Sequence, residues 1–156
     1  PLGGGTVHLC IDMQTLFAER TDWHVPWLER MLPAGLRLAE ARRERTIFTR
    51  FLPPHNPEQA VGTWRRYYEH WHHMTADRLD PRLIELVPPL ATFSPPALVA
   101  DKRPYSPFKE KRFREAVARH VVGCFVITGA ETDMCVLAAV MDAVGLGYRA
   151  GGGCAL

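Results

Sequence analysis

Short apolar runs alternate with longer amphipathic stretches along the chain. The apolar runs show no regular polar alternation, which indicates strands that are covered on both faces. They lie at residues 6–11, 45–51, 97–100 and 124–128. Apolar positions three and four residues apart predict helices over residues 26–43, 62–76, 81–86, 108–120 and 136–144. This alternation predicts an α/β fold with three layers (α/β/α), in which helices cover both faces of a parallel sheet.

The last part of the chain departs from this pattern. A fifth strand would begin at Tyr148, but three consecutive glycines, Gly151 to Gly153, follow it closely. Glycine weakens a strand because it has no side chain to pack and a large conformational freedom to lose. We therefore expect the fifth strand to be interrupted.

Composition favours one ordinary globular domain over residues 1–156. This length can bury a core without disulfides or a structural metal. A net charge of +2 with scattered arginines does not indicate a nucleic-acid partner, and no run reaches the roughly eighteen apolar residues of a membrane span. The four cysteines show no CxxC spacing. Reduced thiols and a cytoplasmic location are therefore expected.

Three chemically capable residues come where predicted strands end. Asp12 follows the first strand, Lys102 closes the third, and Cys135 follows the fourth across a short turn. In parallel sheets these ends meet at one edge, where ligands bind. Asp101 should face away from Lys102 because side chains alternate along a strand. The pattern thus predicts a site of Asp12, Lys102 and Cys135.

Cys135 is expected in the first turn of a helix for which Thr132 is the candidate N-cap. Unpaired N–H groups and the helix dipole would there favour a thiolate, as a nucleophile requires. Asp12 would accept the thiol proton, and Lys102 would stabilise both negative charges. Each residue alone also has a plainer interpretation: a buried structural cysteine, a turn-capping aspartate and a solvated lysine.

Three motifs in order resemble the isochorismatase-like cysteine hydrolases, a group that includes nicotinamidases and the N-carbamoylsarcosine, biuret and ureidoacrylate amidohydrolases. The resemblance spans nearly the whole chain. The motifs are Ile11-Asp12-Met13-Gln14 with Phe17, Asp101-Lys102 with Tyr105, Ser106 and Phe108, and Thr128-Gly129-Ala130-Glu131-Thr132-Asp133-Met134-Cys135-Val136.

The resemblance implies a parallel sheet of order 3-2-1-4-5-6 and a catalytic triad of Asp12, Lys102 and Cys135. It also implies a cis peptide between Ala130 and Glu131, with the backbone N–H groups of Glu131 and Cys135 forming an oxyanion hole. Phe17 matches a family position that packs on the substrate. A homo-oligomer, either a dimer or a tetramer, is expected on the same ground.

Three departures from the family pattern affect the prediction. Nicotinamidases have an Asp-x-His metal motif where this chain has Phe51 and Pro53, so we expect no catalytic metal and no other cofactor. Isochorismatases proper lack the cysteine and cleave a vinyl ether, so Cys135 favours a C–N bond. The family continues after Tyr148 with a strand and a final helix, so the last strand or strands are expected to be missing here.

The leading hypothesis is an amidohydrolase that cleaves a small amide, carbamoyl or ureido compound through a thioester-type intermediate. Its small-molecule substrate would be bound by Phe17, Trp64, Trp71 and Tyr105, although core or subunit packing is an open alternative for the tryptophans. Two other functions stay open: a catalytically silent binding or assembly module, and a vinyl ether hydrolase. His70, His72 and His73 are expected to be solvated or stacked, since His72 would face away from the other two on a helix.

Overall fold

A five-stranded parallel sheet forms the centre of the computed structural model, which describes residues 4–152. Its strands are β1 (Thr6–Ile11), β2 (Thr46–Phe51), β3 (Leu98–Lys102), β4 (Cys124–Gly129) and β5 (Arg149–Gly152). They lie in the order β3-β2-β1-β4-β5, and every pairing is parallel. All six residues of β1 are buried, because this strand is central and covered on both faces.

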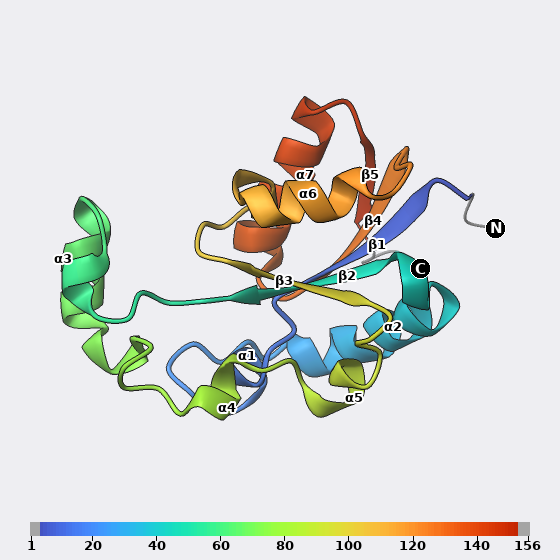
Figure 1. The fold of residues 1–156 in the computed structure, drawn as a ribbon. Helices are drawn as coiled ribbons and strands as arrows, with labels where there is room; N and C mark the ends of the chain where they lie inside the picture. The colour runs from blue at the N-terminus through green and yellow to red at the C-terminus, as the bar shows by residue number, and fades with distance from the viewer. Residues whose placement is uncertain (1–3, 153–156) are drawn as a thin grey trace.

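Helices cover both faces of this sheet and complete three layers (Figure 1). One face carries α6 (Lys111–Ala118) and α7 (Leu137–Gly145). The other carries α1 (Thr15–Ala18), α2 (Leu28–Ala41), α4 (Pro81–Ile84) and α5 (Pro88–Ala91). Two separate apolar cores result, one on each side of the sheet.

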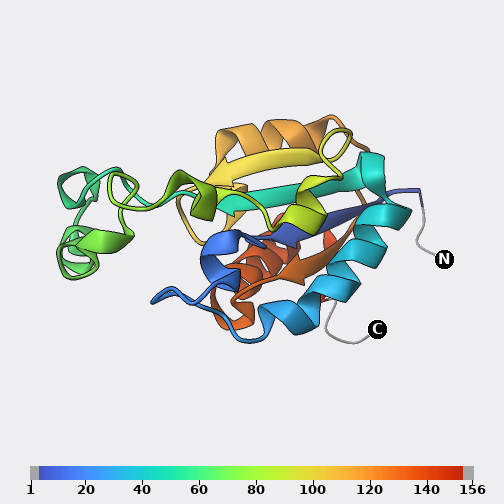
Figure 2. The same ribbon diagram turned by 90° about the horizontal axis from the view of Figure 1, so that it is seen from below.

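One helix lies outside these layers. Helix α3 (Thr63–His70) projects beyond the carboxyl ends of the strands, as Figures 1 and 2 show from two directions. It is flanked by the 3-10 turns η2 (Pro57–Gln59) and η3 (His72–Met74). We call residues 52–80, which leave β2 and return to α4, the arm. Only Tyr68 of α3 is buried, so this helix is not a core element of either layer.

The predicted α/β architecture and sheet order are confirmed for five strands. The expected interruption of the fifth strand is wrong at Gly151 and Gly152, which pair with Val126 and Ile127 of β4. Backbone hydrogen bonding to a neighbouring strand needs no side chain, which is why these glycines can extend it. Residues 153–156, where the rest of that prediction falls, lie outside the described residues.

Several helices are shorter than predicted. The helix expected over residues 62–76 ends at His70, and the one expected over residues 108–120 is divided into the 3-10 turn η4 (Pro107–Lys109) and α6. Another 3-10 turn, η1 (Arg43–Arg45), follows α2. Among the helices in residues 4–152, none has the length and apolar character needed to cross a membrane.

Candidate active site

Asp12, Lys102 and Cys135 meet at the carboxyl ends of the strands, as the sequence predicts. Lys102 Nζ lies 2.7 Å from Asp12 Oδ2 and 3.3 Å from Cys135 Sγ. All three residues are at most 5% exposed. Since the Lys102 ammonium contacts both other groups, it joins the carboxylate and the sulfur into one buried cluster.

The Lys102 ammonium finds a partner for each of its three protons. Its third contact is the carbonyl oxygen of Pro104, at 3.2 Å. The ring of Phe51 lies 5.5 Å away and adds a cation–π contact. Asp101, the neighbour of Lys102, faces the other way and is bound by Arg50 at 2.7 Å. Of the two neighbours, Lys102 is therefore the one that contacts Asp12 and Cys135.

Thr49 holds the carboxylate of Asp12. Its hydroxyl donates to Asp12 Oδ1 at 2.6 Å, while the Asp12 backbone N–H lies 3.2 Å from the same hydroxyl oxygen. Thr49 lies in β2 and is fully buried. The sequence analysis missed this residue, although a polar side chain in a strand expected to be buried was a signal.

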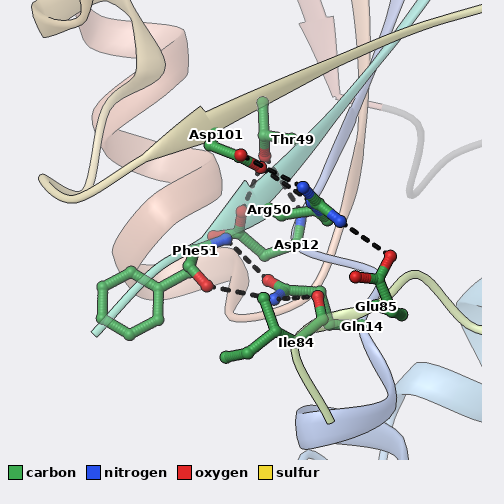
Figure 3. A network of polar contacts seen from close by, with 8 residues as sticks. All are labelled: Asp12, Gln14, Thr49, Arg50, Phe51, Ile84, Glu85 and Asp101. Carbon is green, nitrogen blue, oxygen red and sulfur yellow. Dashed lines mark hydrogen bonds and ion pairs between the residues drawn. The ribbon is translucent and has the colours of Figure 1, made fainter. Parts of the chain in front are cut away.

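Gln14 fixes the beginning of the arm, and its contacts are drawn in Figure 3. Its side chain accepts from the N–H of Phe51 at 2.7 Å and donates to the carbonyls of Phe51 at 3.0 Å and Ile84 at 2.8 Å. A fully buried amide with three such bonds ties the Asp12 loop to the end of β2 and to α4. The sequence analysis named Gln14 only as part of a motif.

The turn before Cys135 differs from the predicted capped helix. Residues Thr132–Val136 form a π-helical turn, and Thr132 is not its N-cap; Glu131 is, without a side-chain cap bond. The cis peptide bonds within residues 4–152 are Ser94–Pro95 and Pro95–Pro96, so the expected cis bond between Ala130 and Glu131 is wrong. The chain instead turns through a left-handed Glu131, with φ 55°.

Gly129 allows this turn to approach Asp12. Its φ is 141°, and a Cβ atom there would lie 2.1 Å from the carbonyl oxygen of Ile11. Asp12 itself has a left-handed backbone, with φ 52°. Two adjacent strand ends thus bend sharply at the same level, which is how they present Asp12 and the Cys135 turn to one another.

The electrostatics of Cys135 oppose a resting thiolate. Burial, followed by the charge of Asp12, raises the pKa of the Cys135 thiol to about 12, although Lys102 lowers it. Burial lowers the pKa of Lys102, but its Asp12 and Cys135 neighbours outweigh that effect and raise it. The raised pKa of the thiol opposes the resting thiolate that the sequence predicts. The sequence could not reveal how completely the sulfur is buried beside Asp12.

Cys135 borders a cavity of about 590 Å³ between the sheet edge and the arm. Phe17, Trp64 and Tyr105 line it, as expected for substrate-binding residues. Trp71 is not among the lining residues. It packs against Trp23 and against the apolar core on the α2 side of the sheet. The sequence analysis missed further lining residues, among them Trp23, Tyr67, Tyr68, Arg103 and Met134.

The three histidines near Trp71 do not form a cluster that could hold a metal ion. His73 pairs with Asp22 at 2.6 Å, and the ring of His70 contacts that of Trp71. His72 contacts the His73 ring edge to face. These stacked and exposed positions agree with the expectation for the three histidines.

Both the sequence and the fold of this chain are similar to those of known proteins. The family model described as the Isochorismatase domain matches residues 6–150. A search of curated proteins gave no match. A cysteine hydrolase from Pseudomonas syringae pv. phaseolicola is similar in structure, with a TM-score of 0.76 and 24% identity, over 97% of this chain and 72% of that one.

Two further solved structures share the fold at lower identity. A pyrazinamidase/nicotinamidase from Streptococcus mutans has a TM-score of 0.68 and 21% identity, over 94% of this chain and 83% of that one. A pyrazinamidase from Pyrococcus horikoshii in complex with zinc has a TM-score of 0.70 and 20% identity, over 92% and 80%.

The zinc of that last protein raises the question of a metal site here. This chain has Phe51 and Pro53 at the positions of the nicotinamidase metal motif, and neither side chain has a ligand atom. In the part of the chain that the structure describes, no three His, Cys, Asp or Glu side chains cluster in a way that could hold a metal ion. The residues present do not fit such a site.

Proposed function

The chain belongs to the isochorismatase family, and from that premise we propose that it is a cysteine-dependent hydrolase that cleaves a C–N bond of a small amide, carbamoyl or ureido compound. One observation carries the proposal. The Lys102 ammonium contacts both the Asp12 carboxylate and the Cys135 sulfur, at the edge of a cavity large enough for a small molecule.

In the first step Cys135 attacks the carbonyl carbon of the substrate while Asp12 accepts the thiol proton. The raised pKa of the thiol makes this coupled transfer necessary, because little free thiolate exists near neutral pH. Lys102 stays charged and offsets the negative charge that moves from the carboxylate to the sulfur and on to the substrate. General-base assistance of this kind contributes roughly a hundredfold to ten-thousandfold.

Backbone N–H groups at the turn would stabilise the resulting oxyanion. The Glu131 carbonyl accepts from the N–H groups on either side of Cys135, those of Met134 at 3.0 Å and Val136 at 3.3 Å. We assign the N–H groups of Cys135 and Glu131 to the oxyanion. One such donor is worth roughly a hundredfold to a thousandfold in rate.

Collapse of this intermediate expels the amine, which takes its proton from Asp12 and leaves an acyl group on Cys135. Asp12, again a carboxylate, then accepts a proton from water as the water oxygen attacks the thioester carbon. The acid (or carbamate) leaves, and the proton returns to the sulfur. Thr49 keeps the carboxylate in position for both transfers.

Replacement of Cys135 by alanine tests the proposal. We expect ammonia release from a panel of primary amides and ureido compounds to fall to background, because no nucleophile remains. Cys124→Ala is the matched control, since this half-buried cysteine lies in β4 and does not line the cavity. Full ammonia release by Cys135→Ala would contradict a cysteine mechanism.

A further inference from the structure

Glu131 places a carboxylate in the wall of the Cys135 cavity. Its side chain is half-buried, and it makes no hydrogen bond or ion pair within the described residues. We propose that the cavity selects amides that carry a positively charged ammonium group, and that Glu131 binds this group. The inference rests on the proposed function, because it names the substrate class of the same site.

Aromatic rings line the same cavity as this carboxylate. Trp64 lies 5.4 Å from Tyr67 and 5.7 Å from Tyr105, between ring centroids, in edge-to-face arrangements. Tyr67 and Tyr68 are 5.1 Å apart in the same way. The faces and edges of these rings can enclose a rounded cation.

The charges around the cavity leave its inner wall negative. Asp12 and Lys102 neutralise one another at 2.7 Å, and the Cys135 thiol is neutral. Glu131 is then the uncompensated charge near the sulfur. Arg103 is the other charged lining residue outside that cluster, but it is exposed, and solvent screens it.

The surroundings of Glu131 disfavour its charged carboxylate. Burial, followed by the charges of Asp12 and Asp133, raises the pKa of the Glu131 carboxyl. The Glu131 charge in turn contributes to a raised pKa of both Tyr67 and Tyr105, so it acts on the aromatic wall. A bound ammonium group would relieve this accumulation of negative charge.

Two isosteric amides provide the probe. Trimethylglycinamide is a cation, and 3,3-dimethylbutanamide has the same shape with carbon in place of the charged nitrogen. Binding is measured by calorimetry to the Cys135→Ala protein, which cannot react. We expect the cation to bind roughly tenfold to a hundredfold more tightly than its neutral isostere, as for a charge-assisted contact.

Glu131→Gln in the Cys135→Ala background should reduce this ratio to about one. Asp133→Asn is the matched control. It removes the same charge two residues from Glu131, and the Asp133 side chain does not line the Cys135 cavity. In this variant the ratio of the two affinities should persist. Glu131→Asp retains the carboxylate and should retain part of the preference. Thermal melting of each variant establishes that it is folded.

Equal binding of the two amides, or no detectable binding of the cation, would overturn the inference. So would a preference that Glu131→Gln leaves intact, or tighter binding of the anionic amide succinamate, which would assign selectivity to Arg103. If Glu131→Gln does not fold, the inference is still tested by the ratio of cation to neutral-amide affinity in the Cys135→Ala protein and by the change of that ratio in Glu131→Asp. Because no turnover is measured, failure here is distinct from failure of the cysteine mechanism.

Discussion

The inner and outer walls of the cavity are built in opposite ways. On the inner wall Cys135 lines the cavity and contacts Lys102, which in turn pairs with Asp12. All three residues are at most 5% exposed and lie at the carboxyl ends of parallel strands. On the outer wall Trp64, Tyr67 and Tyr105 are 38–41% exposed, and two of them lie on an arm that leaves the sheet. Buried polar contacts hold the residues of the inner wall in place, whereas contacts between partly exposed rings hold those of the outer wall.

This difference assigns chemistry and selection to separate parts of the molecule. Neither charge of the Asp12–Lys102 pair can be removed without leaving the other buried and unpaired. The outer wall can lose a ring at little cost to the fold, because each ring already faces solvent. Changes to this pair should therefore affect rate and stability together, whereas changes on the outer wall should affect substrate binding alone.

Lys102→Met should have the largest effect. It removes the ammonium that offsets the charge on Asp12 and on the reacting sulfur, so kcat/KM should fall roughly a thousandfold. Leaving Asp12 buried without its partner should also lower the free energy of unfolding by about 3–5 kcal/mol. Steady-state kinetics and urea unfolding measure the two effects.

Lys109→Met is the control for this variant. Lys109 also pairs with a carboxylate, that of Asp142 at 3.1 Å, but its side chain is 65% exposed. Exposed pairs contribute about 0–1 kcal/mol, so neither rate nor stability should change much. Equal losses in the two variants would remove the distinction between a buried catalytic pair and a surface pair.

Trp64→Ala should have a smaller and different effect. We expect KM to rise several-fold while kcat and the free energy of unfolding change little, because the ring lines the cavity and is 40% exposed. Trp27→Ala, at a tryptophan that is 62% exposed and outside this cavity, should leave KM unchanged. A large fall in kcat or in stability on Trp64→Ala would show that the arm contributes to chemistry or folding as well as to substrate binding, and would contradict the division between the two walls.

The same division explains what could be predicted from the sequence. Apolar runs located the strands, and charged residues at their ends located Asp12 and Lys102, because parallel topology brings such ends together. The arm was predicted only as a helix, because nothing local shows that α3 would project rather than pack. Trp71 was consequently expected in the site, whereas Trp23, from a loop 48 residues earlier, was not.

Local patterns also misjudged the turn before Cys135. A threonine three residues before the cysteine suggested a capped helix and a thiolate, but the chain makes a π-helical turn from a left-handed Glu131. The thiol's raised pKa comes from burial and from Asp12, which is distant in sequence. Thr49 and Gln14 were missed for the same reason, since their importance lies in partners 35 or more residues away.

The central claim is that Cys135 forms a covalent bond to the substrate. The most direct test mixes the protein with its best amide from the panel, quenches in acid within a turnover, and measures the intact mass and the peptide that contains residue 135. We expect added mass equal to the acyl portion, on Cys135 alone. Continued ammonia release with Cys135 unmodified at every quench time, and no hydroxamate when hydroxylamine is present, would contradict it.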